Sequence, residues 1–112
     1  MTGSTEMMKG TVVPITLKLL SERTMYGFEI IKEVNKRSNQ VLEWREATLY
    51  PWLHRLEQEG LIHSEWIEQP ETRRRKYYTI TRKGAAVLAR QTSEWTELSG
   101  AVSAILSPML TA

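Results

Sequence analysis

The chain has 112 residues, of which 15 are Lys or Arg, 13 are Glu, and none is Asp or Cys. This length suits a single domain, and the absence of Cys excludes a disulfide framework, a Cys-based zinc site and a thiol nucleophile. No apolar run reaches the ~18 residues of a membrane span, and the start of the chain lacks the pattern of a signal peptide, so we expect a cytoplasmic protein.

The first predicted elements are two helices separated by a polar turn. Apolar residues recur at helical spacing within residues 7–20. Pro14 inside this stretch predicts a kink or a late start, because proline lacks the backbone N–H that an interior turn uses. Residues 21–24 are the expected turn. A four-residue apolar repeat then predicts a second helix over residues 25–38.

The third helix is predicted over residues 46–59. Pro51 indicates that the helix begins only about a turn before it, because the first-turn N–H groups have no partner to lose, and Gly60 suits the position just after a helix end. The buried face of this helix is expected to be an apolar stripe made of Leu49, Trp52, Leu53 and Leu56.

The outward side of this helix carries polar side chains that can exchange hydrogen bonds with base edges and phosphates in a DNA major groove. By itself, such a side is equally typical of an ordinary solvated helix. If it contacts DNA, His54 projects from the middle and can touch a base, whereas Arg45 and Arg55 are as well suited to phosphates. The residues assigned to this recognition face are Thr48, Tyr50, His54, Arg55 and Gln58.

A basic β-hairpin is predicted next. Residues 61–68 and 75–80 have the composition of strands, and the polar segment 69–74 between them is the expected loop. Residues 72–93 contain seven basic residues and no acidic one, whereas the chain on either side is net acidic. Cations held beside an ordered strand suit phosphate binding. We assign that role to Arg73, Arg74, Arg75, Lys76 and Tyr77, flanked by Arg45, and expect Tyr77 and Tyr78 to point to opposite strand faces.

The last predicted helix runs from about Arg82, after Thr81 as its N-cap, to about Ser107, before Pro108. Its apolar residues form a heptad seam about two turns longer than a small core needs. The seam can fold back onto the first helix of its own chain or pack against that helix in a second chain. We expect both, and therefore a homodimer. The seam residues are Trp95, Leu98, Val102 and Ile105, followed by Met109.

Five segments stand out in chain order: KGT (9–11), YGFEI (26–30), EATLYPWLHRLEQEGLI (46–62), RRRKYYTIT (73–81) and KG (83–84). Together they resemble the PadR family of bacterial transcriptional regulators. The resemblance covers about residues 7–107, and the single C-terminal helix is similar to that of the smaller PadR subfamily. The resemblance implies a mainly α-helical (α+β) fold with a small β-hairpin wing. Residues 1–81 would form a winged helix-turn-helix and residues 82–112 a dimerisation helix, together one compact unit.

The same resemblance implies a dimeric repressor that binds double-stranded DNA at a palindromic operator. In some small members, which bind drugs, a Trp of the last helix forms the wall of a pore at the dimer centre, and Trp95 matches that position. Two such rings near a two-fold axis can stack on a planar aromatic effector, with Ser99, Met8 and Val13 as further walls. With no Asp in the chain, the carboxylate that would attract a cationic ligand is not evident, which leaves neutral or anionic aromatics.

Two other classes of function fit the sequence less well. An enzyme needs a reactive constellation, and the chain has no glycine-rich phosphate loop and no metal-ligand spacing; His54 and His63 lie nine residues apart on different elements. We therefore expect no catalysis, cofactor or metal. A winged-helix module that binds another protein in place of DNA would carry acidic or apolar residues on the outward helix face and a neutral wing. The polar face and the basic hairpin favour DNA.

Overall fold

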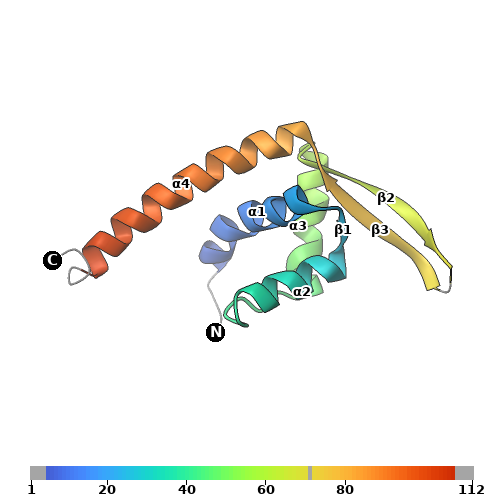
Figure 1. The fold of residues 1–112 in the computed structure, drawn as a ribbon, viewed down its shortest axis with the longest axis horizontal. Coiled ribbons are helices and arrows are strands. Elements are labelled where there is room, and N and C mark those ends of the chain that lie inside the picture. Colours follow the sequence, from blue (N-terminus) through green and yellow to red (C-terminus); the bar gives the residue numbers. More distant parts are fainter. Residues whose placement is uncertain (1–4, 71, 108–112) are drawn as a thin grey trace.

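The computed structural model describes residues 5–70 and 72–107, and for residues 5–9 and 72 it describes the backbone alone. Within these ranges the chain forms four helices and a three-stranded antiparallel sheet (Figure 1). This confirms the expected α+β winged-helix fold. In chain order the elements are α1 (Thr5–Glu22), β1 (Met25–Tyr26), α2 (Gly27–Arg37), α3 (Glu46–Gln58), β2 (Ile62–Gln69), β3 (Thr72–Ile80) and α4 (Arg82–Leu106).

The hydrophobic core lies where α1, α2 and α3 meet the base of the sheet. From α3 it takes Leu49, Leu53 and Leu56, which are buried as the apolar stripe predicted, while Trp52 lies half-buried at the margin. Burial of such side chains stabilises the fold by ~25 cal/mol for each Å² of apolar surface removed from water. The other helices and the sheet contribute Val12, Leu17, Leu19, Leu20, Met25, Ile30, Ile31, Val34, Ile62 and Tyr78, among others.

Helix α1 runs through Pro14 as one element and begins at Thr5, so the expectation of a late start was wrong. Proline removes one hydrogen bond and costs a helix interior ~3 kcal/mol. Here the helix has buried side chains on both sides of the proline, Val12 before it and Leu17 after it. Tertiary packing therefore holds both halves of α1 in place.

The second helix begins two residues later than predicted, because Met25 and Tyr26 form a short strand. They pair with Tyr78 and Tyr77 of β3, which places β3 in the middle of the sheet order β1-β3-β2. The backbone N–H of Tyr26 donates to Glu29 Oε1 at 3.1 Å, which caps the start of α2. A two-residue strand has no period of its own, so its apolar residues were counted into the helix.

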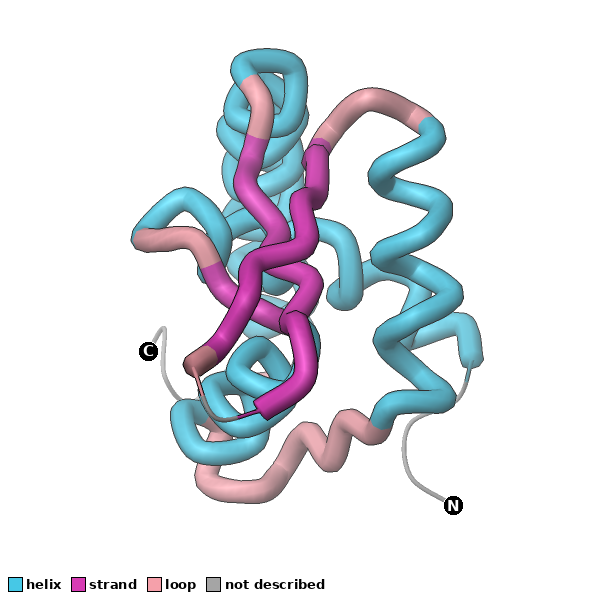
Figure 2. Tube along the Cα trace, turned by 90° about the vertical axis from the view of Figure 1, so that its right-hand side faces the viewer, coloured by secondary structure: helices cyan, strands magenta, loops and turns pink. Residues whose placement is uncertain are grey.

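The hairpin has a shorter tip than predicted, because β3 begins at Thr72 and takes up Arg73 and Arg74. The expectation that these arginines belong to the loop was therefore wrong. Strands β2 and β3 extend beyond the helices, so long charged side chains on both faces remain in water and are compatible with strand structure. In Figure 2, viewed from the hairpin side, the two strands cross in front of the helices.

The start of α4 is tied to the end of α3. Thr81 caps α4 as expected: its Oγ1 accepts from the Gly84 N–H at 3.0 Å and donates to the Gly60 carbonyl at 2.7 Å. Lys83 Nζ donates to the Glu59 carbonyl at 2.9 Å, so a cation meets the C-terminus of α3. Gly60 has a φ of 78°, the left-handed conformation expected at this helix end. These contacts set the direction in which α4 leaves the core.

Helix α4 packs on the core along its first part and leaves it afterwards (Figure 1). Val87 and Leu88 are half-buried against the core. Farther along, the seam is open to solvent: Leu98 is 58% exposed and Ile105 77% exposed. The seam beyond Trp95 therefore keeps much of its apolar surface in water within the single chain.

Candidate nucleic-acid interface

The crossing of α2 and α3 is fixed by a buried anchor in the connection between them. Trp44 is almost fully buried, and its backbone is held at two points by one side chain. Asn35 Nδ2 donates to the Trp44 carbonyl at 3.1 Å, and the Trp44 N–H donates to Asn35 Oδ1 at 2.8 Å. The N-terminus of α3 is thereby attached to α2, which leaves the outward side of α3 facing solvent.

That outward side contains the predicted recognition residues in different surroundings. His54 and Gln58 are exposed and have no polar partner among the described residues, whereas Thr48 is half-buried. Arg55 lies 5.1 Å over the Trp52 ring, and its Nε is 3.3 Å from Glu59 Oε2. His54 and Gln58 are therefore the side chains best placed to reach base edges.

Tyr50 occupies a different position from the other recognition residues. It is 39% exposed, but its hydroxyl lies against Gly27 so closely that a Cβ at Gly27 would overlap it. Desolvation raises the pKa of Tyr50, with the Glu46 carboxylate adding to the rise. Tyr50 thus packs α3 against the start of α2, and glycine at position 27 makes this approach feasible.

The hairpin presents two different basic faces. On the face away from α3, the Arg75 guanidinium lies 4.4 Å over the Tyr26 ring, and the Tyr26 and Tyr77 rings meet edge-to-face at 5.4 Å. Tyr78 points the other way into the core, as expected, and burial raises the pKa of Tyr78 to about 12.

The second face of the hairpin looks toward α3 and carries the remaining two wing cations. Arg74 lies 5.1 Å and Lys76 lies 5.8 Å from the centroid of the Trp66 ring. The sequence reasoning missed both aromatic partners, Tyr26 and Trp66. Tyr26 was assigned to the second helix because its spacing from Ile30 is helical. Trp66 was missed because the residue opposite it depends on how β2 pairs with β3, which the sequence of one strand does not reveal.

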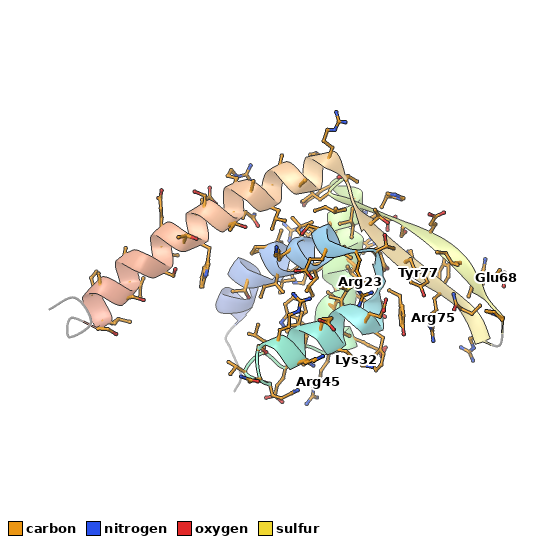
Figure 3. The ribbon with its side chains drawn as sticks, in the orientation of Figure 1. Arg23, Lys32, Arg45, Glu68, Arg75 and Tyr77 are labelled. Atoms are coloured by element: carbon orange, nitrogen blue, oxygen red, sulfur yellow. The ribbon has the colours of Figure 1, made fainter. Side chains whose placement is uncertain are left out.

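Further cations lie on and around α2 (Figure 3). Arg45 occupies the N-cap position of α3, is exposed, and has no partner among the described residues. Lys32 lies 5.8 Å over the Phe28 ring on the outer side of α2. Arg23 is paired with Glu29 at 3.1 Å. Among these three cations, Arg45 and Lys32 have no ion-pair partner in the part of the chain that the structure describes.

The residues predicted to bind an effector are only partly brought together in one chain. Trp95 is 52% exposed and borders a groove of about 530 Å³ with Pro14, Ile15 and Leu42. Val13 lines a different groove, beside Trp52, and the Ser99 hydroxyl donates back to the Thr96 carbonyl at 3.4 Å. The side chain of Met8 lies outside the described residues, as does Met109.

The described residues lack two further features. None of their helices combines the length and the apolar character needed to cross a bilayer. They also contain no group of three His or Glu side chains placed to hold a metal ion.

Comparisons with known proteins relate these features to a family. The family model described as "Transcriptional regulator PadR-like family" matches residues 16–90. A Lysinibacillus sphaericus protein described as uncharacterized is 36% identical over 93 residues, which are 83% of this chain and 85% of the relative. The solved structure of a transcriptional regulator from Clostridium thermocellum is 34% identical, with a TM-score of 0.81 over 88% of this chain and 96% of that chain. A PadR-like transcriptional regulator from Bacillus cereus is 30% identical, with a TM-score of 0.79 over 92% and 98% of the two chains.

Proposed function

Because this chain belongs to the PadR-like family of transcriptional regulators, whose members are not enzymes, we propose that it is a dimeric repressor that binds a palindromic DNA operator. The observation that carries the proposal is the basic hairpin beside the outward side of α3. A winged helix that binds proteins in place of DNA would not need four consecutive cations on its wing. Here Arg73, Arg74, Arg75 and Lys76 stand on β3.

Base contacts are proposed for the exposed part of α3, and backbone contacts for the wing. His54 and Gln58 project into solvent and suit base edges, while Arg45 and the wing cations suit phosphates. Tyr50 and Thr48 are proposed to act closer to the DNA backbone, because part of each side chain is already packed.

Dimerisation is proposed through the exposed seam of α4. Leu98, Val102 and Ile105 lie in water in the single chain, and a surface of several large apolar side chains on one helix face usually marks an interface. Packing this seam against α1 of a second chain about a two-fold axis would place the two α3 helices ~34 Å apart, one turn of DNA. The two half-sites of the operator would then lie on one side of the duplex.

An effector site is proposed where the seam begins. The Trp95 ring borders an apolar groove against α1, and a second copy would bring another Trp95 near the axis. A planar aromatic molecule could stack between the two rings and change the separation of the two DNA-binding units. Ser99, Met8 and Val13 remain proposed as further walls of this site.

The experiment that tests the proposal is a gel shift on the DNA upstream of the protein's own gene. We expect a single shifted species that an excess of unrelated duplex displaces poorly. A footprint on the same DNA should show protection of two half-sites about one turn apart. A His54→Ala, Gln58→Ala variant should lose the preference for this DNA while still binding random duplex. Equal affinity of the parent protein for own and unrelated DNA would refute sequence-specific binding.

A further inference from the structure

The Trp66 ring on β2 of the hairpin wing lies largely in solvent. Trp66 stands in the middle of β2 with 56% of its surface exposed. Exposing a large ring on a strand without a partner is unfavourable, since it forgoes the burial that stabilises such side chains. The ring is instead covered in part by two cations, Arg74 at 5.1 Å and Lys76 at 5.8 Å from its centroid.

The register of the hairpin explains how one ring reaches two cations. Trp66 pairs directly with Lys76, so the two side chains leave the sheet on the same face. Arg74 lies two residues away along β3, where the ladder becomes irregular, and its guanidinium reaches the same ring at 5.1 Å from the centroid. Arg75, between them, points to the other face and lies over Tyr26.

The same face is connected to the recognition helix. Lys76 Nζ is 3.9 Å from Glu57 Oε1 of α3, and it also lies 5.7 Å over the Tyr78 ring. Glu57 in turn accepts a hydrogen bond from Ser64 Oγ of β2 at 2.6 Å. Lys76 is thus held between the wing and the C-terminal half of α3, with Arg74 beyond it toward the tip.

We propose that Trp66 is a positioning residue for DNA binding, which orders Arg74 and Lys76 on the wing face next to α3 before any DNA arrives. This inference rests on the proposed function. A free Arg or Lys side chain loses rotamer freedom when it is fixed on a phosphate, whereas a side chain already stacked on a ring loses less. Stacking on a ring does not neutralise a cation, and Arg74 stays exposed, so its charge remains available to phosphate.

The direct test measures binding to a fluorescent random-sequence duplex, because phosphate contacts do not depend on the operator. Trp66→Leu keeps apolar bulk and removes the aromatic face, and Trp66→Phe keeps a smaller ring. We expect Trp66→Leu to weaken binding about 5- to 50-fold per protomer, the cost of ordering two long side chains, and Trp66→Phe to retain most of the affinity. Ile67→Ala is the matched control, since Ile67 is 40% exposed on the opposite face of the same strand.

A double-mutant cycle separates positioning from direct contact of Trp66 with DNA. In the Arg74→Ala, Lys76→Ala background, Trp66→Leu should cause no further loss, because no cation is left to order. An equal loss in both backgrounds, or no loss from Trp66→Leu in the parent, would overturn the inference. A parent protein that binds no DNA would refute the proposed function instead. Circular dichroism checks the fold, and if Trp66→Leu unfolds, Trp66→Thr, which also lacks an aromatic face and suits a strand, replaces it in the two backgrounds.

Discussion

Glycine-to-alanine substitutions at two positions of α4, Gly84 and Gly100, should have opposite effects on stability, because only Gly84 lies against the junction between β2 and α4. Gly84 is buried in the first turn of α4. A Cβ there would overlap the carbonyl oxygen of Leu61 and lie 2.9 Å from Ile80 Cγ1. That carbonyl cannot move away easily, because it accepts the Thr81 N–H at 3.0 Å. Gly100, by contrast, has no atom within 4 Å of the corresponding position.

The two substitutions can be assigned magnitudes from these contacts. Ala is favoured over Gly in a helix interior by up to ~1 kcal/mol, and Gly100→Ala should gain about that much. At Gly84 a clash with a fixed backbone costs ~1–3 kcal/mol, which outweighs the helical gain. We expect a net loss of up to ~2 kcal/mol for Gly84→Ala and thus a gap of ~1–3 kcal/mol between the variants.

Urea denaturation followed by circular dichroism measures this gap at one fixed protein concentration, because dimerisation would make stability depend on concentration. Gly100 lies on the side of α4 opposite the Trp95–Ile105 seam, so its substitution should leave dimerisation unchanged. If Gly84→Ala raised the denaturation midpoint as Gly100→Ala does, the close approach of α4 to Leu61 would be refuted. The direction of α4 would then need another explanation.

Four other predictions test the wing, the seam, the Trp95 groove and the core. Replacing Arg73, Arg74 and Arg75 with Ala should weaken binding to specific and random DNA alike and reduce the salt slope by ~0.9 for each lost phosphate contact; an unchanged slope in a gel-shift series would remove the wing from the interface. Sedimentation should give a mass near twice 13.0 kDa, and Val102→Glu should give a monomer, whereas a monomeric parent at micromolar concentration would contradict the seam assignment. A planar dye should quench tryptophan fluorescence in the parent and lose this effect in Trp95→Ala, with Trp66→Phe as the control; equal quenching in parent and Trp95→Ala would rule out the groove. Because burial raises the pKa of Tyr78 to about 12, the native state favours the neutral phenol. Its contribution to stability is therefore full below pH ~10 and lost as the pH rises toward 12. In Tyr78→Phe the free energy of unfolding, measured by denaturation at each pH, should fall less over this alkaline range, and an equal fall in both proteins would refute the assignment.

Much of the helical framework was predictable because its signals are local. The stripe of α3, the left-handed Gly60 and the Thr81 cap each depend on residues within a turn or two, and the structure confirms all three. The outward position of His54 and Gln58 follows from the same helical period. The assignment of these two residues to base contacts stays a prediction.

The errors lie where distant segments meet. Strand β1 is two residues long and exists because Tyr77 and Tyr78, some fifty residues later, provide its partners. The early start of β3 likewise depends on pairing with β2, which extends the ladder to Thr72. No local pattern contains these pairings, since a strand is stabilised by hydrogen bonds to another segment.

The sequence by itself determined the helix faces, the basic character of the wing and an apolar seam longer than the core requires. It could do so because helical periodicity and charge are properties of neighbouring residues. Only the tertiary structure decided which side chains share a surface: Tyr50 against Gly27, Arg75 over Tyr26, and Arg74 with Lys76 over Trp66. These contacts depend on cross-strand register and on the angle between α2 and α3, which are set by packing between residues far apart in the chain.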